Sequence, residues 1–479
     1  MSSNDAVSPR PASSLAPVRP EFRWGTATAA FQIEGDGAGR GESIWDEMCR
    51  QPGRIADGSN GQVACDHVHR YAEDVALMTG LGVNAYRFSI SWPRVQPGGR
   101  GPLAEAGVGF YDRLVDELLG AGIEPWATLY HWDLPLELAG AAGGWTNRDV
   151  VERFTEYALA IHSALGDRIQ HWLTLNEPWC SSWLGYGSGD HAPGDRDHVA
   201  AARASHHLLL AHGTAVRALR AQAPADHRLG IVLNLANVHP APGREDDEDV
   251  AAAVRTVDGT QNRWWLDALF SGKYPADLLE LLGPGLDGYI QDDDLATIAT
   301  PIDILGINYY NDHFVDLGGP PNRTMSRAYP VPERFTSVDP GSEGTGIGWP
   351  VTPHGLTDIL LRVGNEYPEA PPLAVTENGS AYPDADTAPA DGSVVEDPDR
   401  VAYLRRHLEA LEIARQKGAD VQAYFAWSLI DNFEWAWGYA QRFGIVHVDF
   451  ATQERRPKRS YQVYRDHIAK HAENRPNQN

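Results

Sequence analysis

Short apolar runs alternate with segments of helical periodicity from residue 22 to the end of the chain. Eight of these runs are short and rich in β-branched and aromatic residues, which is typical of buried strands. They cover residues 22–27, 83–90, 123–129, 169–175, 228–235, 303–308, 372–376 and 421–428. Eight strands that alternate with helices are the number that closes a parallel barrel.

Apolar stripes at helical spacing lie between these runs. Phe110, Leu114 and Leu118 recur at i, i+4 and i+8, and a second stripe begins at Val151 and Phe154. We therefore predict an α/β fold, a single-domain (β/α)8 TIM barrel with long βα loops, over residues 21–470. Residues 1–20 are expected to form a flexible N-terminal tail and residues 471–479 a disordered C-terminal tail.

Residues 309–352 are rich in Pro and Gly and show little periodicity. A stretch of this length inside a compact domain is too long for an ordinary connector and is usually functional. We expect it to form a wall over the mouth of the barrel.

Polar and aromatic residues gather where the predicted strands end. Barrel enzymes place their sites on that face, whereas a single polar residue there is often only a helix cap. Seven of the eight strands end in this way, which favours a site. The residues are Gln32, Glu34, Arg87, His131, Trp132, Asp133, Asn176, Glu177, Asn308, Tyr310, Glu377, Asn378 and Trp427.

Two of these residues, Glu177 and Glu377, follow the fourth and seventh strands and would face each other across a closed barrel. Glycoside hydrolysis needs two carboxyl groups that flank the scissile bond. A separation of about 5 to 5.5 Å gives retention of configuration, and about 6.5 to 9.5 Å gives inversion. The sequence leaves this distance open.

Composition limits which kinds of molecule the protein is expected to bind and where it is expected to be located. The 65 acidic and 40 basic side chains give a net charge of −25, which repels nucleic acid and anionic membrane surfaces and suits a neutral small molecule. Three cysteines without CxxC spacing and an N-terminus without an apolar stretch indicate a cytoplasmic protein. Asp66, His67 and His69 lack a distant third histidine, so no metal is predicted. Whether the chain forms a homo-oligomer stays open.

Eight segments together resemble glycoside hydrolase family 1, in that family's order, from about residue 22 to residue 464. They are FRWGTATAAFQIEG, RFSISWPR, YHWDLP, LTLNEPW, GYGSGDHAPG, GINYY, VTENG and WSLIDNFEWAWGY. The resemblance implies a retaining β-glycosidase, in the first place a β-glucosidase that acts on terminal β-D-glucosyl residues of β-glucosides and cello-oligosaccharides. No cofactor is expected, because two carboxyl groups suffice for this chemistry.

The resemblance also implies residue roles. Glu377 would be the nucleophile and Glu177 the acid/base, while Arg87 and Tyr310 hold Glu377 ionised. Trp427 would stack beneath the sugar, and Trp349 would form a wall on the aglycone side. The full substrate-binding set is Gln32, His131, Trp132, Asn176, Asn308, Tyr310, Trp349, Trp427, Glu434, Trp435 and Phe443.

Alternatives remain beside this interpretation. β-Galactosides and β-fucosides are open as further substrates, because the O4 configuration would be read through shared hydrogen bonds at Gln32 and Glu434. A 6-phospho-β-glucosidase is disfavoured because Glu434 would repel a phosphate, and a thioglucosidase because Glu177 is retained. A non-catalytic sugar-binding relative is disfavoured because both glutamates are present.

Overall fold

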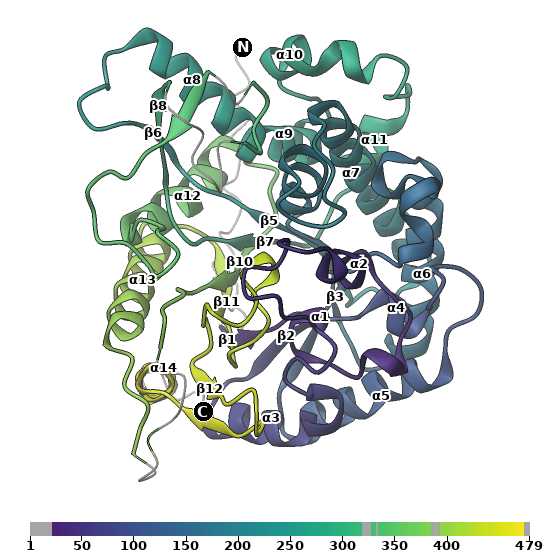
Figure 1. Ribbon diagram of the computed structural model, residues 1–479, viewed down its shortest axis with the longest axis vertical. Coiled ribbons are helices and arrows are strands. Elements are labelled where there is room, and N and C mark those ends of the chain that lie inside the picture. Colours follow the sequence, from purple (N-terminus) through teal and green to yellow (C-terminus); the bar gives the residue numbers. More distant parts are fainter. Residues whose placement is uncertain (1–21, 319–326, 332–333, 385–388, 390–392, 474–479) are drawn as a thin grey trace, which may run out of the picture.

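The computed structural model describes residues 22–318, 327–331, 334–384, 389 and 393–473. Eight parallel strands close into a barrel in the order β1-β11-β10-β7-β5-β4-β3-β2 (Figure 1). Each predicted strand is present, with ends within two residues of the predicted ones. The strands are β1 (Arg23–Ala27), β2 (Ala85–Ser89), β3 (Glu124–Tyr130), β4 (His171–Asn176), β5 (Arg228–Asn234), β7 (Ile304–Asn308), β10 (Leu373–Asn378) and β11 (Val421–Trp427).

Helices follow the strands and surround the barrel (Figure 1). The two predicted stripes lie on α5 (Glu105–Gly120) and α6 (Asp149–Leu165), with their apolar residues buried. The other α-helices are α1 (Ala30–Ile33), α2 (Ile44–Arg50), α3 (His67–Leu81), α4 (Trp92–Val95), α7 (His198–Gln222), α8 (Glu248–Asp258), α9 (Trp264–Ser271), α10 (Ala276–Leu286), α11 (Asp294–Ile298), α12 (Pro353–Glu366), α13 (Pro398–Gln416) and α14 (Arg459–Glu473).

The predicted boundary at residue 470 is wrong for three residues, because α14 continues to Glu473. Its apolar residues Tyr461, Tyr464 and Ile468 are buried against the barrel, and His471 in its last turn packs against Trp24 at 5.1 Å between ring centroids. This packing keeps the last turn helical. The predicted N-terminal tail, residues 1–20, and the end of the chain from residue 474 lie outside the described residues.

The long segment after β7 contains two short strands that the sequence pattern did not indicate. They are β8 (His313–Leu317) and β9 (Phe335–Ser337), which form a small sheet with β6 (Val238–Pro240). Strands of three to five residues are too short to give a clear period in the sequence. The segment lines the mouth of the barrel through Tyr310 and Trp349, as predicted.

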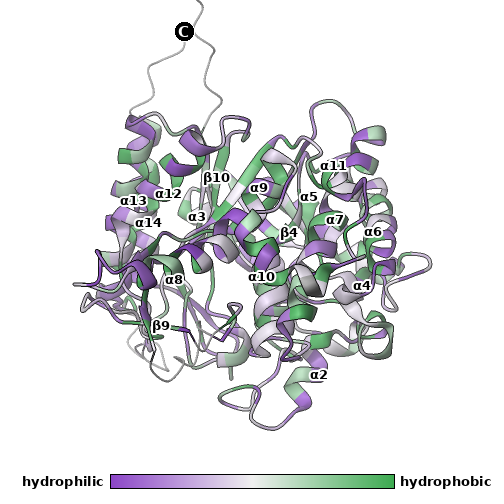
Figure 2. Cartoon of the chain, turned by 90° about the horizontal axis from the view of Figure 1, so that it is seen from above, coloured by the Kyte–Doolittle hydropathy of each residue, from purple (hydrophilic) through white to green (hydrophobic). Residues whose placement is uncertain are grey.

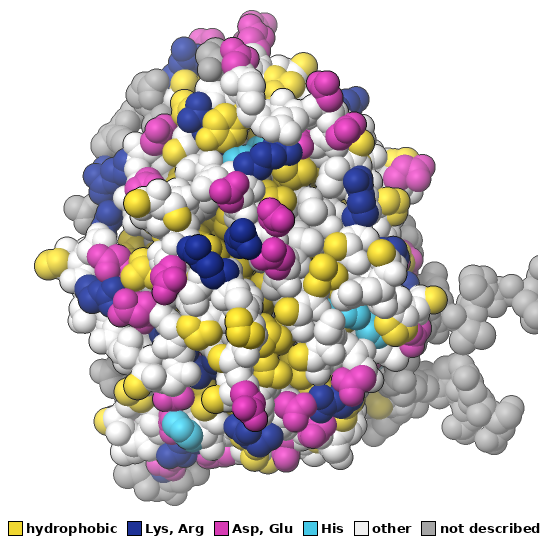
Figure 3. All heavy atoms as spheres, turned by 90° about the vertical axis from the view of Figure 1, so that its right-hand side faces the viewer, with side chains coloured by type: hydrophobic (Ala, Val, Ile, Leu, Met, Phe, Trp, Pro, Cys, Tyr) yellow, Lys and Arg dark blue, Asp and Glu magenta, His cyan; other side chains and the backbone are white. Residues whose placement is uncertain are grey.

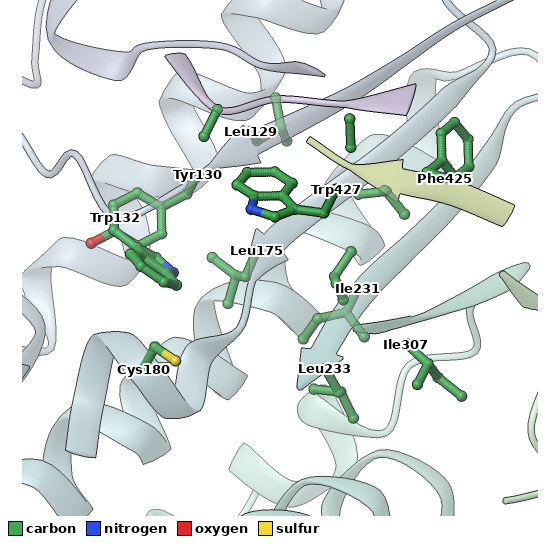
Figure 4. Packing of buried hydrophobic residues seen from close by; sticks show 14 of the residues in the cluster. Leu129, Tyr130, Trp132, Leu175, Cys180, Ile231, Leu233, Ile307, Phe425 and Trp427 are labelled. Atoms are coloured by element: carbon green, nitrogen blue, oxygen red, sulfur yellow. The ribbon is translucent and has the colours of Figure 1, made fainter. Parts of the chain in front are cut away.

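The barrel interior is packed with side chains. β2, β7 and β10 are buried at every position, which is why these strands read as apolar runs without alternation. Figure 4 shows Leu175, Ile231 and Trp427 in the space that the strands enclose. Outer helices such as α13 and α6 carry both hydrophobic and hydrophilic residues (Figure 2), because each helix packs one face on the barrel and exposes the other.

Two strands become irregular just before their glutamates. The pairing of β4 with β5 shifts between Leu173 and Asn176, and that of β10 with β7 shifts between Val375 and Glu377. Gly379 follows, and a Cβ atom on it would lie 1.7 Å from the Trp427 carbonyl oxygen. Only glycine permits this close approach of β10 to β11, which holds the end of β10 in place.

Candidate active site

Glu177 and Glu377 open into one cavity at the carboxyl end of the barrel, with a volume of about 140 Å³. Glu377 lies in β10, and Glu177 directly follows β4. β7 and β5 separate the two strands, and Asn308 at the end of β7 is paired with Glu377 in the register. The barrel therefore brings together two carboxyl groups that are 200 residues apart in the sequence.

Glu377 is held by two strong donors. Arg87 Nη1 donates to Oε1 at 2.6 Å, and the Tyr310 hydroxyl donates to Oε2 at 2.6 Å. Burial raises the pKa of Glu377 above its ordinary value, although the Arg87 charge and the hydrogen bonds from Tyr310 and Arg87 act in the opposite direction. Because Arg87 is itself buried and always charged, the negative charge of the pair resides on Glu377.

Glu177 has the opposite environment. Its Oε1 accepts a hydrogen bond from Asn308 Nδ2 at 2.6 Å, and its Oε2 accepts one from the Cys180 thiol at 3.0 Å. Burial, and then the charge of Glu377, raise the pKa of Glu177 to about 8. Glu177 therefore keeps its proton at neutral pH while its neighbour is ionised.

The Asn308 amide acts on both carboxyl groups. Its Nδ2 donates to Glu177, and its hydrogen bonding is also among the causes that lower the pKa of Glu377. Both carboxyl groups therefore lie beside the Asn308 side chain, which is opposite Glu377 in the pairing of β7 with β10. This arrangement favours the shorter carboxyl separation, which goes with retention of configuration.

A chain of hydrogen bonds runs from Arg87 to His131. Arg87 Nη2 donates to Asn176 Oδ1 at 2.6 Å, which fixes the orientation of that amide, and Asn176 Nδ2 donates to His131 Nε2 at 3.0 Å. His131 must then carry its proton on Nδ1, which has no partner among the described residues. Burial lowers the pKa of His131 well below its usual range. The neutral ring can therefore donate its Nδ1–H to a ligand hydroxyl.

Gln32 and Glu434 form a second group of polar side chains at the site. Gln32 Nε2 donates to the Phe433 carbonyl oxygen at 2.9 Å and lies 3.4 Å from Glu434 Oε2. Gln32 Oε1 is buried and has no partner among the described residues. Burial and the charge of Glu377 raise the pKa of Glu434 to about 8. Glu434 and Gln32 thus offer both a donor and acceptors.

Aromatic rings make up the rest of the cavity wall. The Trp427 ring is parallel to that of His131, at 5.8 Å and 15°, and Trp132 is anchored by donating to the Asn176 carbonyl oxygen at 2.9 Å. Flat indole faces with nearby polar groups suit a sugar ring, which has apolar C–H faces and hydroxyl edges. The aromatic lining residues among those predicted are Trp132, Tyr310, Trp349, Trp427, Trp435 and Phe443.

The structure thus brings the predicted site residues together. Eleven of them line the cavity, and Gln32, Arg87 and Asn176 are hydrogen-bonded to residues that line it. The sequence prediction missed Cys180, which touches Glu177 and lines the cavity. Its position three residues after Glu177, one helical turn onward, was the available signal. Further lining residues that were missed are Trp179, Leu184, His191, Asn234, Leu235, Ala236, Gln261, Asn311, His313, Ile347 and Trp437.

Several other site types find no support in the part of the chain that the structure describes. No group of three His, Cys, Asp or Glu side chains could hold a metal ion, and His67 is instead hydrogen-bonded to Asp74 at 2.7 Å. No Lys or Arg lines the cavity beside Glu434, so a phosphate would find no cation there. Figure 3 shows acidic and basic side chains intermixed on the face in view. Among these residues no helix is apolar over the length that a bilayer requires.

Comparisons with known proteins identify the family of the chain. The family model described as "Glycosyl hydrolase family 1" matches residues 15–473. The chain is similar to thermostable β-glucosidase B of Thermobispora bispora, at 47% identity over 93% of this chain and 89% of the relative. It is 45% identical to a bifunctional β-D-glucosidase/β-D-fucosidase of Bifidobacterium breve, over 94% of this chain and 98% of the relative.

A solved structure indicates the same family. The crystal structure of the psychrophilic β-glucosidase BglU from Micrococcus antarcticus superimposes with a TM-score of 0.89 at 48% sequence identity. The match covers 94% of this chain and 97% of that one. On the family model and on these relatives, the chain belongs to glycosyl hydrolase family 1.

Proposed function

We propose that the protein is a retaining β-glucosidase, which releases terminal non-reducing β-D-glucosyl residues from β-glucosides and cello-oligosaccharides. One observation carries this proposal: two carboxyl groups share a cavity, and of the two only Glu377 is paired with a buried guanidinium. Glu377 is ionised against Arg87 at 2.6 Å, while the pKa of Glu177 is raised to about 8. A nucleophile must be ionised and a general acid protonated, and this pair meets both conditions at neutral pH.

In the first step, the Glu377 carboxylate attacks the anomeric carbon. The bond to the glycosidic oxygen breaks, and that oxygen takes the proton of Glu177 and departs as the alcohol. The sugar is now an ester of Glu377, so the negative charge that raised the pKa of Glu177 has gone. Glu177, now ionised, can take a proton from water.

In the second step, that water attacks the anomeric carbon and restores the Glu377 carboxylate. Two displacements on one carbon return the β configuration. Arg87 and Tyr310 stabilise Glu377 as the leaving group, and the reprotonated Glu177 begins the next cycle.

The glycone is held by groups that lack partners in the free protein. His131 Nδ1–H would donate to a sugar hydroxyl, Gln32 Oε1 would accept from another, and Trp427 would cover the sugar's apolar face. Asn176 would strengthen its bond to the 2-hydroxyl in the transition state. The relative from Bifidobacterium breve, named for glucosidase and fucosidase activity, supports β-fucosides as further substrates.

Two features of the site disfavour a 6-phospho-β-glucosidase and a non-catalytic sugar-binding protein. The cavity lining has no Lys or Arg among the described residues, which disfavours a 6-phosphoglycoside. A sugar-binding protein without activity would not need a carboxyl group whose pKa is raised to about 8 beside an ionised one.

A cytoplasmic location belongs to the same proposal. Asn378 of the triplet Asn378-Gly379-Ser380 is buried, and its amide donates to the Tyr309 carbonyl oxygen at 2.7 Å. A glycan could not be attached there without breaking the site, and Cys49, Cys65 and Cys180 are free thiols. Both features suit a compartment without glycosylation or disulfide formation.

The proposal is tested by following hydrolysis of 4-nitrophenyl β-D-glucoside by ¹H NMR. We expect β-glucose to form first and α-glucose to appear only by mutarotation. Initial release of α-glucose would refute the retaining mechanism, and turnover of the 6-phosphorylated substrate alone would replace the proposed substrate class.

A further inference from the structure

The strand that carries Glu377 contains one extra residue directly before it. Val375 is paired with Ile307 of β7, and Glu377 is paired with Asn308, the next residue of β7. Thr376 is therefore the extra residue of a β-bulge in β10. Bulges are common beside active sites, where they redirect a side chain. Here the bulge places both Thr376 and Glu377 next to the Asn308 side chain.

The Thr376 hydroxyl holds one end of the Asn308 amide. It donates to Asn308 Oδ1 at 2.7 Å, and the described part of the chain offers that oxygen no other donor. The Thr376 side chain is fully buried, and its branched Cβ limits its rotamers. A Cβ atom on Gly306 of β7 would lie 2.9 Å from both Oγ1 and Cγ2 of Thr376, so glycine leaves the room that this side chain fills. Packing therefore fixes the direction in which the hydroxyl points.

The other end of the Asn308 amide faces the acid/base. A side-chain amide has its acceptor on one side and its donor on the other, so a fixed Oδ1 also fixes Nδ2. Asn308 Nδ2 donates to Glu177 Oε1 at 2.6 Å and to Asn176 Oδ1 at 3.1 Å. The Asn176 contact is the longer one, and Asn176 Oδ1 already accepts from Arg87 at 2.6 Å. The Thr376 hydroxyl is therefore the stronger anchor of this amide.

The bond from Asn308 makes the two oxygens of Glu177 unequal. In a protonated carboxyl group the carbonyl oxygen is the better acceptor, and the other oxygen carries the proton. Because Asn308 donates to Oε1, the proton of Glu177 resides on Oε2. That oxygen lies 3.0 Å from the Cys180 thiol, which lines the cavity, and a hydroxyl oxygen can accept from the thiol while it donates its own proton. Burial raises the pKa of Glu177, and the hydrogen bond from Asn308 acts in the opposite direction.

We propose that Thr376 is a positioning residue for the acid/base: through the Asn308 amide it keeps Oε2 of Glu177 as the oxygen that gives its proton to the leaving group. This inference rests on the proposed function, in which Glu177 protonates the glycosidic oxygen. Thr376 does not line the cavity and acts through Asn308, which does. As the proton passes from Oε2 to the glycosidic oxygen, negative charge develops on Glu177, and the bond from Asn308 to Oε1 becomes stronger.

The test compares variants that lose the Thr376 hydroxyl with one that keeps it. Thr376→Val keeps the branched shape, Thr376→Ala needs less room beside Gly306, and Thr376→Ser keeps the hydroxyl. In the Val and Ala variants, kcat/KM for phenyl β-glucoside should fall about 10-fold or more, because the acid is no longer held in place. The basic limb of its pH profile should move up by about half a unit to one unit, because a hydrogen bond that lowers the pKa of Glu177 is lost. For 2,4-dinitrophenyl β-glucoside, which needs no acid, kcat/KM should fall less than about 3-fold. Thr376→Ser should restore both the rate and the limb.

Thr174→Val is the matched control. Thr174 is a buried threonine of β4 whose hydroxyl is hydrogen-bonded to His212 at 2.7 Å, and neither residue lines the cavity. This variant also loses a buried hydroxyl, but its basic limb and the ratio of its rates on the two substrates should remain as in the wild type.

The positioning role would be overturned by an unmoved limb and an unchanged ratio in both Thr376→Val and Thr376→Ala. The same changes in Thr376→Ser or in Thr174→Val would overturn it as well. Any of these results with an active wild type contradicts the role of Thr376 alone. A wild type that does not hydrolyse phenyl β-glucoside contradicts the proposed function, and this inference with it.

Discussion

Replacement of Glu177 by Ala should lower kcat/KM most for substrates whose leaving group must be protonated as it departs. A positioned general acid contributes about 10² to 10⁴ in rate. We expect kcat/KM to fall by about that factor for phenyl β-glucoside, whose leaving group must be protonated. It should fall by less than about 10-fold for 2,4-dinitrophenyl β-glucoside, which leaves as a stable anion.

The pH dependence gives a second measure of the same residue. With the pKa of Glu177 at about 8, about nine-tenths of the free enzyme carries the proton at pH 7. Wild-type kcat/KM should therefore be level near neutrality and fall about 10-fold per pH unit above 8, because the acid is then deprotonated. In Glu177→Ala that basic limb should be absent.

The assay is steady-state kinetics on both substrates from pH 5 to pH 10, with Glu177→Gln as the isosteric control that keeps the shape of the side chain. Added azide should restore turnover of the dinitrophenyl substrate in Glu177→Ala and yield β-glucosyl azide, because the anion enters the vacated space. A variant that keeps wild-type activity on phenyl β-glucoside, or keeps the basic limb, would refute the acid/base assignment.

Three further predictions concern other groups. Glu377→Gly should abolish hydrolysis but allow glycoside synthesis from α-glucosyl fluoride, measured by product mass; hydrolysis at the wild-type rate would count against the nucleophile. Cys180→Ala removes a hydrogen bond that lowers the pKa of Glu177, so the basic limb of kcat/KM should move to higher pH and return in Cys180→Ser; an unmoved limb would mean that the thiol has no such role. Lys458→Met removes the buried ammonium that pairs with Asp431 and Asp384, while Asp431 keeps Arg442 at 2.8 Å; the free energy of unfolding should fall by about 1 to 3 kcal/mol in urea denaturation, whereas the exposed Lys417→Met should change it little.

The barrel could be predicted because its strands are short, apolar on both faces and separated by helices with clear stripes. The strand ends followed from the same pattern, and so did the position of Glu177 and Glu377 on one face. β8 and β9 could not be found, since strands of this length carry no period and gain their order from pairing with each other and with β6. The last turn of α14 was missed because its packing against Trp24 is a tertiary contact.

The protonation pattern of the site was implied by the family resemblance, and the residue pattern alone could not give it. That Glu177 is protonated and Glu377 ionised depends on which carboxyl group meets Arg87, a contact across 290 residues. The tautomer of His131 depends in turn on Asn176, whose orientation Arg87 fixes. The contact between Cys180 and Glu177 is local, but the residue type alone did not mark it as part of the site.

The covalent bond between Glu377 and the sugar can be detected by intact mass spectrometry. The protein is incubated with 2,4-dinitrophenyl 2-deoxy-2-fluoro-β-D-glucoside, in which fluorine slows both steps and the good leaving group lets the intermediate accumulate. We predict a mass increase of one fluoroglucosyl unit that peptide mapping places on Glu377 and that is absent from Glu377→Gln. An adduct on another residue, or none in a preparation that hydrolyses β-glucosides, would mean that Glu377 is not the nucleophile.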